Sequence, residues 1–475
     1  MSRAVTGTGA IFRLPEVVKV IKSDFIVLPC DLVCELDGSA LLETWMTLEA
    51  GLGGEKSGRR GGLGVWYPTK GLEGISTKAE QTDFVATVPL PKSRPPPPQK
   101  SLRQDVSQLV MSAPMTTVKD IIEDNGALPI RHMLLKRHGH VGIKTTHRDA
   151  HVYFFPNWAL QMMEANEFDS VAEDVVGWWA KATWQPGLGD KLGLRTVLAD
   201  STDSTEGGDD MIGSMQFEDE VDLVGMSTTA ASRVPAVIQN ALSSSTPLTI
   251  PPLLSYVQPS HTSSPSPQPL IRRVDTSALL LSISLHLARL GPASESLHPL
   301  SHTSKIAHQE TLHPHSRISE ADSLIAENVA IEARVTVKES VIGVGCKIDQ
   351  GARITRCLLM DYVTVGPGVT LTGCILGRRA RVEGASEKEK GDVTRLVDCE
   401  VAPGFVVEGG SKSLFCTAYE LLSTDGLQPR PRVRSSWRLR DWMMLEIWIW
   451  ILMMMRWVMT AGLIWEDRRH VPLSE

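Results

Sequence analysis

A carboxylate at the end of an apolar run is the first candidate for chemistry in this sequence. The stretch 23–36, SDFIVLPCDLVCEL, is apolar from Phe25 to Leu28, and Pro29 and Cys30 separate this run from Asp31. Ligands of open α/β sheets bind at the carboxyl ends of the strands. We therefore expect a buried strand that brings Asp31 to such an edge, either as a metal ligand or as the vestige of one.

A second acid is needed, because one carboxylate does not hold Mg²⁺ tightly without phosphates or another carboxylate. Glu173 and Asp174, in EDVVGWW, are the candidates. Acids in the first turn of a helix also interact favourably with its dipole, and we favour this structural role. Three tryptophans nearby are interpreted as core or interface residues rather than a substrate platform: Trp178, Trp179 and Trp184.

Two further groups of residues have polar side chains that chemistry could use. Asp190, Lys191 and Arg195, in GLGDKLGLR, are either polar interface groups or solvated loop residues, and the sequence leaves both interpretations open. The segment 291–320 carries five histidines: His298, His302, His308, His313 and His315. A metal site needs a scaffold that fixes the ligand geometry, so we favour a solvated loop here. We predict no catalytic residue, no cofactor and no metal ligand beyond the vestigial candidate Asp31.

The elements that must position these residues alternate between helix and strand in the first 200 residues. Helical patterns cover 14–23, 37–48 and 156–166, whereas 62–69 and 82–90 are strand-like, and 140–156 predicts two strands around a turn. This alternation is typical of an α/β layered domain. The insert PKSRPPPPQK at 91–100 is interpreted as an extended polyproline loop.

The domain boundaries follow from changes in composition and pattern. We predict a partial α/β domain at 1–200, a disordered acidic and serine-rich linker at 201–248, a strand and helix completing the α/β domain at 249–290, a loop at 291–320, a β-helix at 321–420 and a tail at 421–475. The tail is rich in tryptophan and methionine, and it is either a genuine apolar segment or an acidic terminus read in the wrong frame.

A repeat of seventeen residues dominates the region 321–412. Three aliphatic columns carry it: Ile325, Ile342, Leu359 and Leu376; Ile331, Ile348, Val365 and Val382; and Val337, Ile354 and Leu371. Each period is a triangular coil with one inward aliphatic side chain per side, as in hexapeptide parallel β-helices. Five glycines suit the corners: Gly343, Gly345, Gly366, Gly368 and Gly373. Cys357 and Cys374 share one column and are expected to stack as free thiols.

Composition excludes several function classes. The net charge of −7 does not suggest a surface for nucleic acid or an anionic membrane. The longest apolar run of the tail, Ile447–Met455, is nine residues, whereas a membrane-spanning helix needs about 20. The seven cysteines form no CxxC pair, which favours free thiols in the reducing cytosol. Hexapeptide acyltransferases commonly use a histidine base, but residues 316–469 contain none.

An α/β domain followed by such a β-helix is the layout of sugar-nucleotide pyrophosphorylases. Those enzymes need a glycine-rich phosphate loop after the first strand. The segment GTGAIFRLPE at 7–16 has GxG, but Arg13 lies four residues after Gly9, where the loop would place an arginine two residues after the second glycine. We therefore expect the first strand and the phosphate loop to be missing, with an incomplete Rossmann-like sheet.

Several longer blocks resemble fungal gamma subunits of the guanine-nucleotide exchange factor for translation initiation factor 2. These blocks are SDFIVLPCDLVCELDG, DAHVYFFPNWAL, EDVVGWWAKATWQPGLGDKLGLR, PPLLSYVQPS, IRRVDTSALLL and the repeat region. The resemblance implies a nucleotidyltransferase-like domain and a left-handed β-helix. It also implies a non-catalytic cytosolic subunit that scaffolds the catalytic epsilon subunit, assembles with the other subunits and helps bind the GTP-binding initiation factor 2. The alternative is an active sugar-phosphate nucleotidyltransferase similar to mannose-1-phosphate guanylyltransferases.

Overall fold

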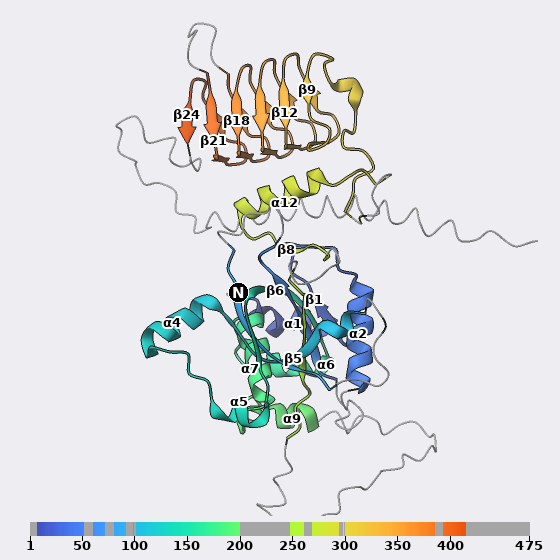
Figure 1. Ribbon diagram of the computed structural model, residues 1–475, viewed down its shortest axis with the longest axis vertical. Helices are drawn as coiled ribbons and strands as arrows, with labels where there is room; N and C mark the ends of the chain where they lie inside the picture. The colour runs from blue at the N-terminus through green and yellow to red at the C-terminus, as the bar shows by residue number, and fades with distance from the viewer. Residues whose placement is uncertain are drawn as a thin grey trace, which may run out of the picture. The chain divides into compact units, whose positions relative to one another are not determined.

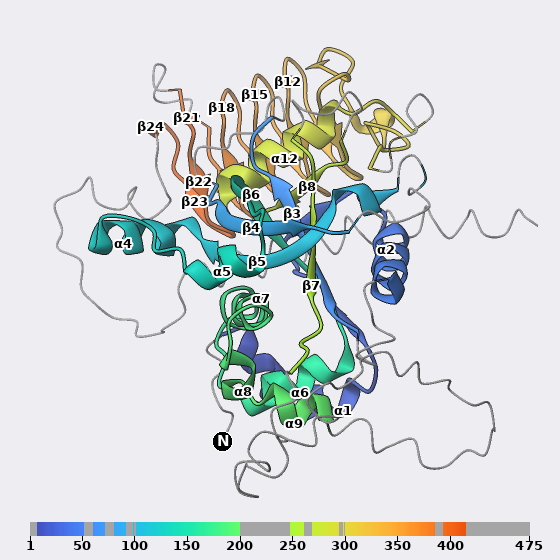
Figure 2. The same cartoon turned by 60° about the horizontal axis from the view of Figure 1, so that its bottom comes forward.

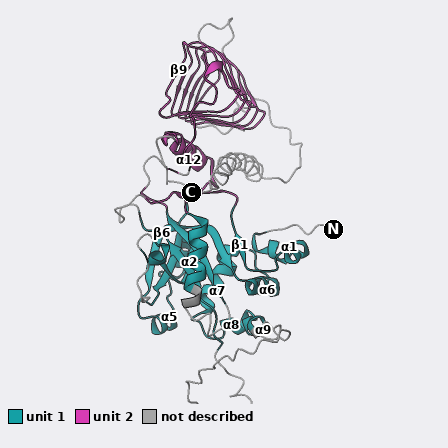
Figure 3. Cartoon of the chain, turned by 90° about the vertical axis from the view of Figure 1, so that its right-hand side faces the viewer, with its two compact units in different colours: residues 1–29, 37–68, 81–260 teal, residues 30–36, 69–80, 261–475 magenta. Residues whose placement is uncertain are grey.

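The computed structural model describes residues 7–51, 60–71, 80–91, 98, 101–199, 248–260, 268–293, 298, 300–384 and 393–414. The chain divides into two compact units, coloured separately in Figure 3. Unit 1 comprises Met1–Pro29, Asp37–Pro68 and Gln81–Ser260, and unit 2 comprises Cys30–Leu36, Thr69–Glu80 and His261–Glu475. The boundary crosses the opening stretch 23–36, so its two halves belong to different units.

Unit 1 is built on one sheet of mixed direction. Its strands are β1 (Phe25–Val27), β3 (Gly62–Pro68), β4 (Asp83–Pro89), β5 (Val106–Pro114), β6 (Gly142–Phe155) and β7 (Leu253–Val257). The order is β1-β6-β3-β7-β5-β4, with an additional pairing of β6 and β4. Among the described strands of this sheet only β3 and β7 pair in parallel. The predicted strands at 62–69 and 82–90 are confirmed.

Helices cover both faces of this sheet (Figures 1 and 2). They are η1 (Gly9–Arg13), α1 (Pro15–Val20), α2 (Gly38–Gly51), η2 (Leu102–Asp105), α4 (Met115–Asn125), α5 (His132–Arg137), α6 (Asn157–Ala165), η3 (Val171–Val176), α7 (Gly177–Ala182), α8 (Leu188–Lys191) and α9 (Leu194–Ala199). Alternate residues of β4 point to opposite faces. Val85 packs with α6 and α7, whereas Phe84 and Ala86 pack with α4 and α5. The predicted α/β layering is therefore present.

Strand β6 corrects the prediction of two strands around a turn at 140–156. It is one strand of 14 residues whose first half pairs with β4 and whose second half pairs with β1 and β3. A bulge replaces the turn, because the register with β3 shifts between Gly64 and Trp66 and His151 has a φ of 53°. Polar residues at a bulge resemble a turn in sequence, which explains the error.

Strand β1 corrects the prediction that the stretch 23–36 contains a buried strand that ends on Asp31. The segment forms two short strands, β1 in unit 1 and β2 (Leu32–Cys34) in unit 2. β1 pairs only with β6 among the described strands, and Ile26 is 48% exposed. A strand paired on one side leaves part of its apolar run at the surface, so the run is not a central strand.

Unit 2 contains three parallel sheets that form a β-helix. The first sheet has β10 (Leu324–Ile325), β13 (Val341–Ile342), β16 (Leu358–Leu359), β19 (Ile375–Leu376) and β22 (Glu400–Val401). The second has β11 (Ala330–Ile331), β14 (Lys347–Ile348), β17 (Thr364–Val365), β20 (Arg381–Val382) and β23 (Val406–Val407). The third has β9 (Arg317–Ile318), β12 (Thr336–Lys338), β15 (Arg353–Thr355), β18 (Thr370–Thr372), β21 (Arg395–Val397) and β24 (Lys412–Leu414).

The three predicted aliphatic columns form the core of this β-helix. Ile325, Ile342, Leu359 and Leu376 are register partners in the first sheet, and the other two columns behave in the same way. The structure extends the β-helix beyond the prediction at its start. Residues 291–320 include η5 (Gln309–Thr311), β9, and bridges from Ile306 and Leu312 to the first and second sheets. This first coil lies nineteen residues before the next, outside the seventeen-residue period.

Helix α12 (Ser277–Arg289) lies along the first sheet of the β-helix (Figure 1). Leu279, Leu280 and Ile283 of the helix form one cluster with apolar outward residues of that sheet. Those outward residues are Leu324, Val341, Leu358 and Ile375. The prediction assigned 249–290 to the α/β domain. Only β7 lies there, because the apolar face of α12 is buried on the β-helix.

The corners of the coils use left-handed backbone at many residues other than glycine. Positive φ angles recur in three columns: Asn328, Gly345, Tyr362, Arg379 and Gly404; Arg334, Gly351, Gly368 and Gly410; and Glu339, Arg356, Gly373 and Asp398. Gly345, Gly368 and Gly373 therefore serve as predicted. Gly343 and Gly366 are needed for another reason, since an added Cβ would lie 2.7 Å from Asp361 Oδ1 or 2.4 Å from Gly384 N of the next coil.

Some predictions lie outside the described residues. Residues 201–247 of the predicted linker at 201–248, the tail at 421–475 and most of the insert at 91–100 belong to this part of the chain. Within the described residues, no helix is long and apolar enough to cross a membrane.

Candidate functional site

Asp31 lies in unit 2, immediately before β2, and its carboxylate is engaged. β2 pairs antiparallel with β8 (Ile271–Arg273), and Leu32 lies opposite Arg273. Arg273 Nη2 is 3.0 Å from Asp31 Oδ2, and Arg273 Nε donates to Oδ1 at 3.4 Å. The side chain of Asp31 is 4% exposed and that of Arg273 is 16% exposed. A bidentate guanidinium therefore neutralises the carboxylate away from solvent.

Further polar contacts fix the pair of strands that carries Asp31. Val274 N donates to the backbone oxygen of Asp31 at 2.7 Å. Glu35 Oε2 accepts from Leu270 N at 2.8 Å, and Glu35 Oε1 lies 3.1 Å from His298 Nε2. Burial raises the pKa of Glu35. These contacts make the region around Asp31 a structural junction rather than an open site.

A second carboxyl cluster lies in unit 1, at the bulge of β6, and sequence reasoning missed it. Asp83, at the start of β4, accepts from Asp149 N at 2.7 Å. Asp149 Oδ1 accepts from His151 N at 2.8 Å, and the hydroxyl of Tyr153 donates to Asp149 Oδ2. Asp149 therefore closes the bulge that places His151 in the left-handed region.

Burial perturbs the titration of this cluster. It raises the pKa of Asp83 to about 6, and the neighbouring Asp149 carboxyl adds to this rise. Burial lowers the pKa of His147 to about 4, although its Nε2 lies 3.1 Å from the backbone oxygen of Gln258. A carboxyl with a pKa near 6 has the protonation behaviour of a general acid or base. Functional sites are enriched in such groups.

Metal ligation is the other chemistry that carboxylates suggest. The described residues contain no group of three or more His, Cys, Asp or Glu side chains that could hold a metal ion. The five histidines of 291–320 have different surroundings. His298 contacts Glu35, and burial lowers the pKa of His302. His308, His313 and His315 are exposed.

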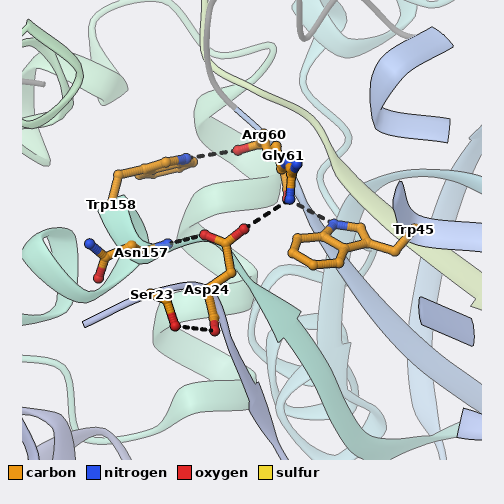
Figure 4. Close-up of polar contacts among 7 residues, drawn as sticks. All are labelled: Ser23, Asp24, Trp45, Arg60, Gly61, Asn157 and Trp158. Carbon is orange, nitrogen blue, oxygen red and sulfur yellow. Dashed lines mark hydrogen bonds and ion pairs between the residues drawn. The ribbon is translucent and has the colours of Figure 1, made fainter. Parts of the chain in front are cut away.

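Another carboxylate, Asp24, joins three segments of unit 1 (Figure 4). Asp24 Oδ1 accepts from Asn157 N, at the first turn of α6, at 3.0 Å. Asp24 Oδ2 lies 3.2 Å from Arg60 Nη1, and the Arg60 guanidinium stands over the Trp45 ring at 5.9 Å. Trp158 Nε1 donates to Arg60 O at 2.7 Å. This arrangement braces β1, α2 and α6, and we assign it a structural role.

Glu173 and Asp174 occupy a helix N-terminus, as the favoured interpretation predicts. Both lie in η3, whose preceding residue Ser170 accepts from Glu173 N at 3.3 Å. Asp174 Oδ2 accepts from Asp169 N at 3.0 Å and from Ser170 N at 2.9 Å. Both residues lie in unit 1, whereas Asp31 lies in unit 2.

The remaining candidates are divided between core and surface. Trp179 and Trp184 are buried, and they donate to Pro251 O at 2.9 Å and Val110 O at 2.8 Å. Trp178 is 39% exposed and lies under the Lys181 ammonium. Asp190 and Arg195 form an exposed ion pair at 2.8 Å, and Lys191 is exposed. Asp190 and Lys191 lie in α8 and Arg195 lies in α9, so this last group is exposed on helices rather than in a loop.

The predicted column of thiols is confirmed in the β-helix. Cys374 N donates to Cys357 Sγ at 3.4 Å, and both side chains are buried. Cys399 continues the column, because Ile375 N donates to its backbone oxygen as Leu358 N does to that of Cys374. None of the six cysteines of the described residues is in a disulfide. Burial raises the pKa of Cys357, which keeps this thiol protonated and unreactive.

Comparison with known proteins identifies the repeat. Residues 303–389 match the family described as GlmU-like, C-terminal hexapeptide. No curated protein sequence matches the chain. A matching solved structure is a mutant of GDP-perosamine N-acetyl transferase from Caulobacter crescentus, in complex with CoA and GDP-perosamine. It is 22% identical, the match covers 25% of this chain and 54% of that chain, and the TM-score of 0.14 is too low to support an argument.

The three parallel sheets and the family match define the class of this region. The chain carries a GlmU-like hexapeptide repeat domain that fits a left-handed parallel β-helix. This chain spans about half of the transferase that it matches. The domain class fits a hexapeptide-repeat protein of the nucleotidyltransferase-like kind.

Proposed function

We propose that this protein is a non-catalytic assembly subunit of the guanine-nucleotide exchange factor that acts on translation initiation factor 2. In this role it scaffolds the catalytic epsilon subunit in the cytosol, assembles with the other subunits and helps bind the substrate factor. The sequence blocks that resemble gamma subunits support the choice of complex. The bidentate pairing of Asp31 with Arg273 carries the non-catalytic part of the proposal.

The reason lies in what a nucleotidyltransferase requires of Asp31. Mg²⁺ takes near-ideal octahedral oxygen coordination, with carboxylates bound together with substrate phosphates. A carboxylate whose two oxygens face a guanidinium, with a side chain 4% exposed, cannot add a cation unless Arg273 moves away. Separating the pair would leave the buried Asp31 carboxylate and the Arg273 guanidinium without their counter-charges, which is costly. Asp31 is therefore suited to a structural role, in which its pairing with Arg273 is retained in an inherited fold.

The finer fold assignment of unit 1 is part of the same proposal. We propose that its sheet is a Rossmann-like nucleotidyltransferase fold in which substrate chemistry has been lost. Support comes from the order of the units in the chain and from helices on both faces of the sheet. The β-helix supports a scaffold role, because a stiff stack of coils offers long regular faces to partners.

Co-purification tests the proposal directly. The full chain, co-expressed with a tagged epsilon-type subunit, is expected to elute with it as one complex in size exclusion. The complex is expected to accelerate GDP release from initiation factor 2, whereas this chain alone is not. Failure to co-elute with the epsilon subunit would reject the choice of complex.

A sugar-phosphate nucleotidyltransferase similar to mannose-1-phosphate guanylyltransferases is the second candidate. The buried carboxyl pair Asp83 and Asp149 favours it, because the raised pKa of Asp83 is the kind of perturbation found at active sites. Exchange of labelled pyrophosphate into GTP with mannose 1-phosphate and Mg²⁺ would test it. Turnover that is lost in Asp149→Asn and retained in Asp190→Asn would establish this candidate over the first.

A further inference from the structure

The third sheet of the β-helix carries a regular row of basic residues. Its strands are in register, and the first outward position of each strand forms one column, named here the Arg/Thr ladder. In spatial order the ladder consists of Arg317, Thr336, Arg353, Thr370, Arg395 and Lys412. Arginine therefore stands on every second coil along the first five positions, with threonine between.

The ladder is accessible and free of negative charge. Arg317, Arg353, Arg395 and Lys412 are exposed. The second outward column of the sheet contains Lys338, Thr355, Thr372 and Val397, so neither column has a carboxylate among these residues. Within the described part of the chain, Arg317, Arg353 and Arg395 form no ion pair.

The other two sheets differ from this one. The first sheet presents apolar residues, which α12 covers. The second sheet presents Lys347 and Arg381, but Glu332, Asp349 and Glu383 come directly after its inward residues and give a mixed surface. Burial and the neighbouring Glu332 raise the pKa of Asp349, and the nearby Lys347 opposes this rise. In the third sheet the acids Glu339 and Asp398 come one position later, at the corners that follow β12 and β21. The ladder is thus a specific feature of one face rather than a general property of the β-helix.

The spacing of the ladder matches an extended peptide. Neighbouring strands are about 4.8 Å apart, so alternate rungs place the arginines about 9.6 Å apart. A polyproline II chain has three residues per turn and rises about 3.1 Å per residue, so every third side chain lies on the same face, about 9.3 Å apart. We propose that the ladder binds an extended acidic polypeptide that runs along the axis of the β-helix with a carboxylate at every third residue.

The chain itself contains such a pattern. Acidic residues recur every three positions in ADSTDSTEGGDD, at Asp200, Asp203, Glu206 and Asp209. This segment lies outside the described residues and provides the probe for the proposal. The threonines between the arginines can hydrogen-bond to such a peptide, because each hydroxyl is both donor and acceptor.

An acidic peptide fits the ladder better than a nucleic acid does. Proteins that bind single-stranded nucleic acid without sequence preference combine a basic groove with aromatic side chains on which bases stack. Neither outward column contains an aromatic residue. The alternation of arginine and threonine matches single carboxylates at a fixed period more closely than a continuous row of phosphates.

The binding experiment uses the full chain with Asp200→Asn, Asp203→Asn, Glu206→Gln and Asp209→Asn, so that its own segment does not compete. A fluorescein-labelled peptide of residues 199–210 is titrated with this protein at low salt, and its anisotropy is followed. Arg353→Glu with Arg395→Glu is expected to weaken binding by at least about tenfold. Lys347→Glu with Arg381→Glu, which makes the same charge change on the second sheet, is expected to alter binding by less than about threefold.

Two further measurements complete the test. A peptide of the same composition with its acids consecutive is expected to bind several-fold more weakly, because only the three-residue period matches alternate rungs. Thermal melts establish that both double variants are folded. The proposal is overturned by absence of saturable binding, by equal loss in the two double variants, by equal affinity for the rearranged peptide, or by an oligouridylate of equal charge that binds the ladder more tightly.

Discussion

The guanidinium of Arg273 faces the carboxylate of Asp31 along both of its oxygens, with 3.0 Å from Nη2 to Oδ2 and 3.4 Å from Nε to Oδ1. The two residues lie at the short β2 and β8 strands of unit 2, and both side chains are largely shielded from solvent. A charged pair in such surroundings depends on each partner, because either charge alone would be buried without compensation.

Asp31→Asn is therefore expected to destabilise unit 2 by about 3 kcal/mol, since Arg273 would lose its counter-charge. The measurement is urea denaturation of wild-type and variant chains. Asp190→Asn is the matched control, because its ion pair with Arg195 is exposed and should contribute less than about 1 kcal/mol. Equal stability of Asp31→Asn and wild-type protein would show that Asp31 has no structural role.

Asp83→Asn is expected to change how stability depends on pH. The folded-state pKa of Asp83 is raised from 3.8 to about 6, so the folded protein binds more protons than the unfolded chain between these values. Stability from this group therefore falls as pH rises from about 4 to 6, by roughly 2 to 3 kcal/mol in total. The variant lacks this loss, and its stability relative to wild type should be greater at pH 7.5 than at pH 4. A pH-independent difference would contradict the prediction.

His147→Gln is expected to have the opposite effect. The folded-state pKa of His147 is lowered from 6.5 to about 4, so the unfolded chain binds more protons in this range. Stability from this residue is lost as pH falls from 6.5 towards 4, by about 3 kcal/mol. His147 lies opposite Asp83 in the sheet, and the two slopes partly cancel in the wild-type chain. Thermal melts of Asp83→Asn across this pH range should reveal the pH dependence of stability that is due to His147. Melts of His147→Gln should reveal the dependence that is due to Asp83.

Gly368→Ala is expected to destabilise the β-helix by about 1 kcal/mol. Gly368 has a φ of 70°, and an added Cβ would meet nothing within 4 Å, so the cost comes from the backbone conformation alone. Gly139→Ala makes the same chemical change in open space without a left-handed φ, and it should be neutral or slightly stabilising. Guanidinium unfolding of both variants provides the comparison, and equal effects would refute the backbone explanation.

The β-helix could be predicted because each coil repeats the same local requirement. One inward aliphatic residue per side gives columns at a constant period, and Ile342, Leu359 and Leu376 follow it without interruption. The first coil escaped the prediction because nineteen residues, rather than seventeen, separate Ile306 from Ile325. Helix α12 was recognised as a helix, but helical periodicity does not specify which apolar surface covers it.

The polar clusters could not be predicted, since long-range pairing creates them. Asp83 and Asp149 are 66 residues apart, and the bulge of β6 brings them together. Asp31 and Arg273 are 242 residues apart, and their contact depends on a two-stranded pairing with no pattern of its own. The sequence drew attention to Asp31 as an isolated carboxylate, whereas its partner decides what it does.

The seventeen-residue repeat is broken a second time between β20 and β21, again without any change of register. Leu371, Leu376 and Val382 pair with Leu396, Val401 and Val407, each twenty-five residues later. The chain between β20 and β21 is therefore eight residues longer than the repeat requires, while the columns stay in phase. Chain length at this point does not change the geometry of the core, so the segment between these two strands is the natural place to graft an epitope, a fluorophore-binding peptide or a crosslinkable segment.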